Sequence, residues 1–221
     1  MQDKVLIKEI FESIQGEGLY VGVNQLFIRF ARCNLNCRYC DTDFKSNLKE
    51  YTAKELAGIV NNKKNVHSIS LTGGEPLLET DFLINFLPLA DKKIYLETNG
   101  ILFSNLEKII NNVDIISMDI KLPSCTGGKN VFTEHEQFIK IAKQKELFIK
   151  IVFDENITEE EILTCISLAK KYSVFLILQP KMNGEILELK TEFINKIFYR
   201  FINLYQNVRL IPQVHKFLNV R

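Results

Sequence analysis

Three cysteines stand within the eight residues 33–40 of this chain: Cys33, Cys37 and Cys40. Thiolates are soft ligands that suit iron–sulfur clusters and zinc, and three in one short loop can converge on an inorganic centre without help from distant segments. The other two cysteines, Cys125 and Cys165, are isolated and far downstream. The Cys-x3-Cys-x2-Cys spacing therefore predicts a metal centre that keeps one coordination position open for chemistry.

Two other uses of the thiols are open at this point. A zinc site needs a fourth ligand at short spacing, and the nearest histidine is His67. A disulfide framework is disfavoured by the odd count of five cysteines in 221 residues and by an N-terminus of mixed charge that does not read as a signal peptide. We expect reduced thiols in a cytoplasmic protein.

The composition is that of an ordinary globular domain, with 46% hydrophobic and 25% charged residues, and one domain spanning 1–221 is expected. The formal net charge of +1 argues against a general nucleic-acid or membrane surface. No apolar run reaches the roughly 18 residues that a membrane span requires. These features favour a small-molecule partner.

The elements that must position the cysteines alternate between strands and helices. Strands are expected at 5–11, 25–31, 67–72, 93–97, 114–119, 147–153, 174–179 and near 208–211. Helices are expected from a capping box at Thr52, at 80–89, near 104–110, at 133–145, 158–171 and near 191–204. This alternation predicts an α/β fold with a parallel sheet, open or curled into a barrel. Residues 122–130 read as a flexible surface loop containing Cys125, whereas Cys165 lies on a helical core face.

Polar residues follow several of these strands, where the carboxyl ends of parallel strands form the functional face. They are the loop 33–44, Gly73-Gly74-Glu75, Glu97-Thr98-Asn99, residues 119–121 and Gln179. Arg29 stands inside an otherwise apolar strand, which predicts either an anionic partner or an edge strand with this side chain turned to solvent.

The three cysteines, followed one strand later by Gly73-Gly74-Glu75-Pro76, resemble the radical S-adenosylmethionine (SAM) superfamily. The resemblance covers nearly the whole chain and implies a partial TIM-like barrel in which the cysteines hold three irons of one [4Fe-4S] cluster and SAM chelates the fourth. It also implies one-electron cleavage of SAM to a 5′-deoxyadenosyl radical that abstracts hydrogen from the substrate.

The resemblance assigns further residues to the SAM site. Tyr39 would lie along the adenine, and Gly73, Gly74 and Glu75 would receive the amino group. Asp41 is placed beside the same cofactor or as a cap of the loop. The remaining assignments are strand-end residues: Asn99, Asp119, Lys121 and Gln179.

Three separated motifs narrow the resemblance to the 7-carboxy-7-deazaguanine synthases, the queuosine-pathway family that contracts 6-carboxy-5,6,7,8-tetrahydropterin with loss of ammonia. They are residues 13–18, Cys40-Asp41-Thr42 and residues 215–219. The implied architecture is one domain with a short N-terminal substrate loop and a C-terminal tail that closes the site. The implied substrate residues are Ile14, Gln15, Gly16, Glu17, Arg29, Thr72, His215 and Arg221.

A pterin carboxylate would suit the planar fork of Arg29, and its guanine-like edge would suit Gln15 and Glu17. The family resemblance also implies Mg²⁺ on the Thr42 hydroxyl, a reductant such as flavodoxin or ferredoxin, and a homodimer. The terminal Arg221 departs from the small apolar residue expected there. A frayed, functionless tail is the alternative for His215.

Two rival functions stay open on the sequence. One is a radical SAM activase that generates a glycyl radical on a partner protein, and the other is a non-catalytic zinc or iron–sulfur module. The N-terminal Gln15-Gly16-Glu17-Gly18 loop and the tail argue against the activase.

Overall fold

The computed structural model describes residues 4–40 and 46–220, and one large sheet organises them. Its spatial order is β11-β8-β7-β6-β5-β4-β2-β1-β3, and every neighbouring pair from β11 to β2 is parallel. The strands are β1 (Lys4–Ile14), β2 (Asn24–Phe30), β3 (Lys49–Thr52), β4 (Ser68–Gly73), β5 (Ile94–Thr98), β6 (Ile115–Ile120), β7 (Glu146–Phe153), β8 (Phe175–Pro180) and β11 (Val208–Leu210). Because β11 and β3 are separate edges, the sheet is a partial barrel, as expected.

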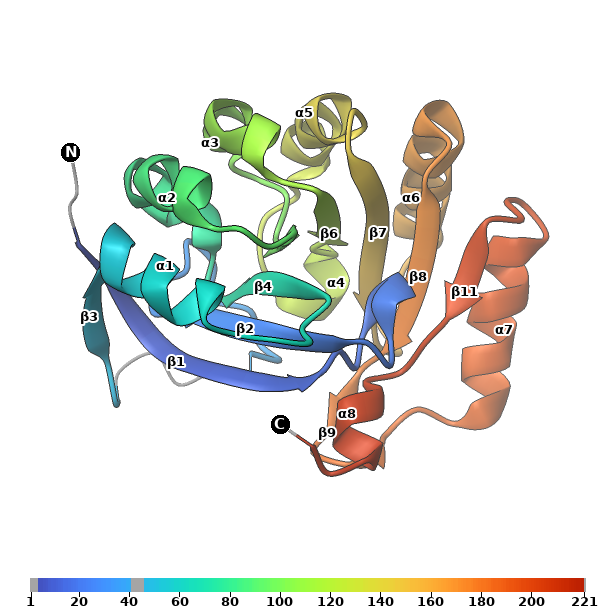
Figure 1. Ribbon diagram of the computed structural model, residues 1–221. Coiled ribbons are helices and arrows are strands. Elements are labelled where there is room, and N and C mark those ends of the chain that lie inside the picture. Colours follow the sequence, from blue (N-terminus) through green and yellow to red (C-terminus); the bar gives the residue numbers. More distant parts are fainter. Residues whose placement is uncertain (1–3, 41–45, 221) are drawn as a thin grey trace.

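Helices cover the outer face of this curved sheet (Figure 1). They are α1 (Ala53–Asn61), α2 (Thr80–Phe86), α3 (Phe103–Ile109), α5 (Phe132–Ala142), α6 (Glu159–Tyr172) and α7 (Thr191–Ile202). Two short helices, α4 (Pro123–Thr126) and α8 (Val214–Phe217), follow β6 and β11. The main core lies between this helical layer and the sheet, where Leu26, Ile28 and Phe30 of β2 are fully buried. In the described residues, none of the helices has the length and apolar character needed to cross a membrane.

The capping-box prediction at Thr52 is confirmed: its hydroxyl accepts from the Glu55 N–H, and the Glu55 carboxylate accepts from the Thr52 N–H. Thr158 and Glu161 form the same reciprocal pair at the start of α6. Each box satisfies backbone donors that a helix start leaves open, which explains why both helices begin where they do.

The N-terminal part of the sheet differs from the expectation of a wholly parallel sheet. β1 pairs antiparallel with β2, and β3 pairs antiparallel with β1. The segment joining β1 to β2 contains no crossover helix, and antiparallel strands can be joined without one. β3 was not expected from the sequence, and neither were β9 (Met182–Asn183) and β10 (Ile186–Leu187). These strands are too short to show the alternation of apolar and polar residues that would predict them.

The prediction of a flexible surface loop at 122–130 is wrong for its first half. α4 folds there, and Leu122, Cys125 and Thr126 are almost completely buried. Burial, together with nearby Asp154, raises the pKa of the Cys125 thiol to about 12. Cys125 is therefore an inert core residue. Cys165 is fully buried on α6, which confirms its structural assignment.

Side-chain alternation along the strands builds the barrel interior in layers. Tyr95, Ile115, Phe148 and Ile177 form a small apolar cluster at the bottom. Two residues further along β5, β6, β7 and β8, the same face carries polar or charged groups: Glu97, Ser117, Lys150 and Gln179. The apolar layer thus supports a polar one at the carboxyl ends of the strands.

Candidate active site

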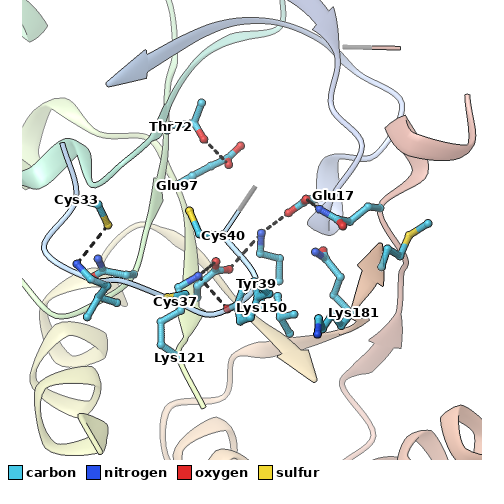
Figure 2. A pocket seen from close by; sticks show the side chains of 18 of the residues that line it. Glu17, Cys33, Cys37, Tyr39, Cys40, Thr72, Glu97, Lys121, Lys150 and Lys181 are labelled. Atoms are coloured by element: carbon cyan, nitrogen blue, oxygen red, sulfur yellow. Dashed lines mark hydrogen bonds and ion pairs between the residues drawn. The ribbon is translucent and has the colours of Figure 1, made fainter. Parts of the chain in front are cut away.

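A cavity of about 540 Å³ opens at the carboxyl ends of the strands. Three thiols lie on one wall, those of Cys33, Cys37 and Cys40, and Glu17 and Lys181 lie on the opposite side (Figure 2). Thirteen of the residues that the sequence assigned to the site line this cavity: Glu17, Arg29, Cys33, Cys37, Tyr39, Cys40, Thr72, Gly73, Gly74, Asn99, Asp119, Lys121 and Gln179. The residues predicted to form the functional face therefore line one and the same cavity.

The start of the cysteine loop is fixed on the turn that follows β4. Glu75 N–H donates to the Arg32 carbonyl at 2.7 Å, and Gly74 N–H donates to the Phe30 carbonyl at 3.0 Å. A Cβ on Gly74 would stand 1.8 Å from the Arg32 carbonyl oxygen, so only glycine permits this approach. The Arg32 guanidinium also makes two hydrogen bonds to the carboxylate of Glu79, at 2.7 and 2.8 Å. The double glycine therefore seats the loop, whatever else it contacts.

The thiols of Cys33 and Cys37 are half-buried, and that of Cys40 is exposed. Burial raises the pKa of Cys33 and of Cys37, and Lys121 opposes the shift at both. Ligation of iron requires thiolates, so metal binding here would release protons. Three accessible thiols on one wall, beside a cation that favours the thiolate form, fit the donor set of an iron–sulfur cluster.

Glu75 does not line the cavity and is fully buried beneath it. Its carboxylate accepts hydrogen bonds from Thr98 Oγ1 and the Asn99 N–H, both at 2.8 Å, and from the Leu77 N–H. Burial raises the Glu75 pKa to about 7 against these donors, which lower it. In this structure Glu75 joins the end of β5 to the turn after β4, and its direct contact with a cofactor stays a prediction.

Asn99 bridges β5 and the cysteine loop. Its Nδ2 donates to Asn34 Oδ1 at 2.7 Å, and its carbonyl accepts a hydrogen bond from Nε2 of the buried His135 at 3.1 Å. Burial lowers the pKa of His135 to about 4, so this imidazole is neutral near pH 7. The loop is thereby attached to a second strand end.

Glu97 presents an oriented carboxylate to the cavity. Three neutral groups donate to it: Gln15 Nε2 at 2.9 Å, Ser70 Oγ at 3.0 Å and Thr72 Oγ1 at 2.8 Å. Gln15 itself is buried, donates to Gln25 and accepts from the Glu17 N–H. Gln15 does not line the cavity. Its contribution to the site is therefore the hydrogen bond that orients the Glu97 carboxylate.

Alternating charges cross the cavity floor from the N-terminal loop to the cysteine side (Figure 2). Lys150 forms ion pairs with Glu17 and with Asp119, the latter at 3.2 Å, and Lys121 donates to Asp119 at 2.6 Å. Burial alone would raise the pKa of Glu17, yet the Lys150 ammonium lowers it to about 2. The pKa of Lys150 is raised, because Asp119 and Glu17 outweigh its burial. Both groups are therefore ionised near neutral pH.

The C-terminal tail folds back onto the N-terminal loop, which contradicts the alternative of a frayed end. Val214 N–H donates to the Gly16 carbonyl at 2.9 Å, and Gln213 Nε2 donates to Glu17 Oε1 at 2.7 Å. The His215 ring lies against Gly16 but does not line the cavity, whereas Gln213 and Lys216 do. Figure 1 shows α8 and β9 together at the open side of the sheet.

Arg29 already has a protein partner. Its Nε donates to Glu9 Oε1 at 2.7 Å, and its guanidinium carbon lies 5.8 Å from the Phe11 ring centroid. β2 lies between β4 and β1, so the edge-strand alternative is wrong. Arg29 also lines the cavity, so its pairing with a substrate anion stays a prediction.

Several lining residues were not assigned from the sequence, among them Arg38, Glu97, Lys150, Lys181, Glu188, Gln213 and Lys216. Lys150 carried the same signal as Arg29, a cation inside an apolar strand, and Glu97 stood among the polar strand ends. Of the assigned residues, Ile14, Gln15, Gly16, Glu75 and His215 do not line the cavity. Asp41, Thr42 and Arg221 lie outside the described residues.

Comparison with known proteins agrees with this geometry. Residues 27–188 match the model of the radical SAM superfamily. The chain is 38% identical to the 7-carboxy-7-deazaguanine synthase of Geobacter sulfurreducens, over 96% of each chain. The chain belongs to the 7-carboxy-7-deazaguanine synthase family of the radical SAM superfamily. The synthase of Archaeoglobus fulgidus is 37% identical, over 96% of this chain and 97% of the relative.

The fold is also that of a solved structure, QueE from Escherichia coli, with a TM-score of 0.67 and 20% identity over 96% of this chain and 95% of that one. Membership of the radical SAM superfamily implies a [4Fe-4S] cluster and SAM. Membership of this superfamily is consistent with the three thiols on one wall of the cavity.

Proposed function

We propose that this chain is a carbon–nitrogen lyase that converts 6-carboxy-5,6,7,8-tetrahydropterin into 7-carboxy-7-deazaguanine with loss of ammonia, in queuosine and 7-deazapurine biosynthesis. The observation that carries the proposal is the single cavity in which three thiols face a set of buried, fixed charges. Relatives that bear this enzyme name and align over 96% or more of their own length support it.

Cys33, Cys37 and Cys40 would hold the cluster, and the bound cluster with SAM would supply the one-electron chemistry that starts hydrogen abstraction. We propose that Tyr39 lies along the adenine. It packs against the core beside the last cysteine, and Lys121 lies over its ring, with Nζ 5.6 Å from the centroid. The other groups proposed to contact SAM are Asp41, Gly73, Gly74, Asn99, Asp119, Lys121 and Gln179, with Glu75 supporting Asn99. Gln179 Oε1 is buried and has no hydrogen-bond partner among the residues that the structure describes, which leaves it available to a ligand donor.

The charged wall suits a carboxylated pterin. The guanine-like edge of the pterin offers N–H donors, and Glu97 is a carboxylate that three neutral donors orient at the cavity. The pterin carboxylate needs a cation, which Arg29 can supply by exchanging its Glu9 partner. Thr72 would contact the substrate next to Glu97, and Gln15 and Glu17 would shape the loop that covers it.

The tail and the N-terminal loop would exclude water from this chemistry. Glu17 is the hub, because it pairs with Lys150 of β7 and accepts from Gln213 of the tail. Radical intermediates react with solvent groups, so a closed pocket protects them. His215 would act through Gly16, as a support of the loop. Ile14 and Arg221 remain assigned to the substrate end by family resemblance alone.

Further assignments, which rest on the family resemblance, belong to the proposal. Mg²⁺ would bind at the Thr42 hydroxyl and take its other ligands from water and substrate, as this cation commonly does. The enzyme would be a cytoplasmic homodimer reduced by a flavodoxin or ferredoxin. We propose one catalytic domain over 1–221, closed by the tail.

The proposal is tested with anaerobically reconstituted protein, SAM, a reductant and the pterin, with and without Mg²⁺. We expect iron and sulfide in the protein, and SAM cleavage that accelerates when the pterin is added. If the rate of SAM cleavage is unchanged by the pterin and depends on a partner protein, the result would favour a glycyl-radical activase. Zinc without sulfide in protein purified without oxygen would favour a non-catalytic module and overturn the radical account.

A further inference from the structure

The short helix α4 contacts the cysteine loop at Arg38. Arg38, which stands between Cys37 and Cys40, donates its backbone N–H to the Thr126 carbonyl at 3.1 Å. Its guanidinium Nη2 donates to the Ser124 carbonyl at 2.5 Å. One residue of the loop is thus held at both its backbone and its side chain by the same turn of helix.

Gly127 makes room for this contact. It ends α4 in the left-handed conformation with φ +74°, and its N–H donates to the Pro123 carbonyl at 2.9 Å. A Cβ at this position would stand 2.8 Å from Arg38 Nε and 3.1 Å from its Cδ. An L-residue at 127 would therefore be strained in its backbone and would press on the Arg38 side chain.

α4 is itself anchored in the core. Ser124 N–H donates to Glu161 Oε1 at 2.9 Å, while the other carboxylate oxygen of Glu161 closes the capping box of α6 with Thr158. Leu122 and Cys125 are almost completely buried. A continuous set of contacts thus runs from α6 through α4 to Arg38.

We propose that Arg38 is a positioning residue for the iron–sulfur cluster, held by α4 and dependent on glycine at 127. Arg38 would fix the backbone between Cys37 and Cys40 and would thereby orient their two thiols. Asn99 and Glu79 hold the earlier part of the loop through Asn34 and Arg32, so the Arg38 contact completes the restraint. With it, folding orders residues 33–40 of the loop and metal binding does not have to.

The inference rests on the proposed cluster site and concerns how firmly this chain retains iron. Groups that orient metal ligands typically change metal affinity by about 10- to 100-fold when removed. We therefore expect Gly127→Ala and Arg38→Ala each to accelerate loss of iron to a ferrous chelator by about tenfold or more in the reconstituted, full-length protein. The electron paramagnetic resonance signal of the reduced cluster should broaden, which a general loss of stability would not produce.

Gly22→Ala is the matched control. Gly22 also has a positive φ, +95°, but a Cβ there would meet no atom within 4 Å, so the substitution imposes backbone strain without pressing on the loop. Its iron loss should match that of the unaltered protein. In an Arg38→Ala background, Gly127→Ala should add little, because the side chain it would press on is gone.

The outcomes separate the two proposals. If the unaltered protein takes up no cluster, the proposed function fails. If it holds a cluster and Gly127→Ala and Arg38→Ala lose iron no faster than Gly22→Ala, the positioning role fails while the proposed function stands. Fully additive effects of the two substitutions would also overturn it, because they would show that Gly127 does not act through Arg38.

Discussion

The pairing of Glu17 with Lys150 makes the stability of the cluster-free chain depend on pH in a way that one substitution can isolate. Glu17→Gln removes the charge with little change of shape, and Lys150 keeps Asp119 as a partner at 3.2 Å. Gln at this position imitates the protonated carboxyl. The difference in the free energy of unfolding between the two proteins then reports the ionised form of Glu17.

The size of this difference follows from the pKa. Lys150 lowers the Glu17 pKa from its usual value of 4.5 to about 2, against the opposing effect of burial. A carboxyl whose pKa is lower in the folded state stabilises fully above its unfolded pKa and loses this contribution as the pH falls towards its folded pKa. At pH 7 the difference is about 3 kcal/mol, and at pH 3 it narrows to roughly half of that.

Urea unfolding at pH 7 and pH 3, followed by circular dichroism, measures both values. Glu136→Gln is the control, since Glu136 pairs with Lys171 on the exposed surface, and it should differ little from the unaltered chain at either pH. A difference for Glu17→Gln that is equal at the two pH values would refute the reasoning. The reasoning would also be refuted if Glu17→Gln and the unaltered chain had the same free energy of unfolding at pH 7.

Three further predictions concern the loop, the substrate and the core. Gly74→Ala should prevent stable cluster uptake, measured as iron content, because its Cβ would strike the cysteine-loop backbone at 1.8 Å. Gly58→Ala, at an exposed position of helix α1, should instead stabilise the fold by about 0.5–1 kcal/mol in urea unfolding. Arg29→Ala should raise KM for the pterin by about 10- to 100-fold through a lost charge-assisted contact, and Glu9→Gln should lower it; unchanged KM in both would contradict the assignment. Cys165→Ser should lower the free energy of unfolding by about 1–3 kcal/mol in urea unfolding, because it buries a hydroxyl, and should leave the iron content unchanged.

Much of the fold and of the cysteine wall could be predicted because their signals are local. Alternating strands and helices indicated the parallel sheet, and the polar residue after each strand indicated the face where side chains meet. The capping residues Thr52 and Glu55 marked a helix start within four letters of sequence. Cys33, Cys37 and Cys40 carry their chemistry in their spacing.

The rest depends on contacts between distant segments. Nothing near Arg29 in the sequence indicates that Glu9 will pair with it, because that pairing follows from the register of β1 against β2. The proline, serine and glycine of 122–130 are typical of loops, and α4 forms there because burial of Leu122 and Cys125 outweighs local preference. Lys150 carries a local signal, a cation inside an apolar strand, but its role depends on Glu17 of a remote loop.

The most direct test of the proposed reaction is a single-turnover measurement in which the anaerobically reconstituted protein, reduced and supplied with SAM and Mg²⁺, is given 6-carboxy-5,6,7,8-tetrahydropterin. We expect 7-carboxy-7-deazaguanine, identified by mass spectrometry, and ammonia in equal amounts, with neither formed by a Cys37→Ser variant. An intact cluster that cleaves SAM but leaves the pterin unchanged would contradict the assignment of this substrate.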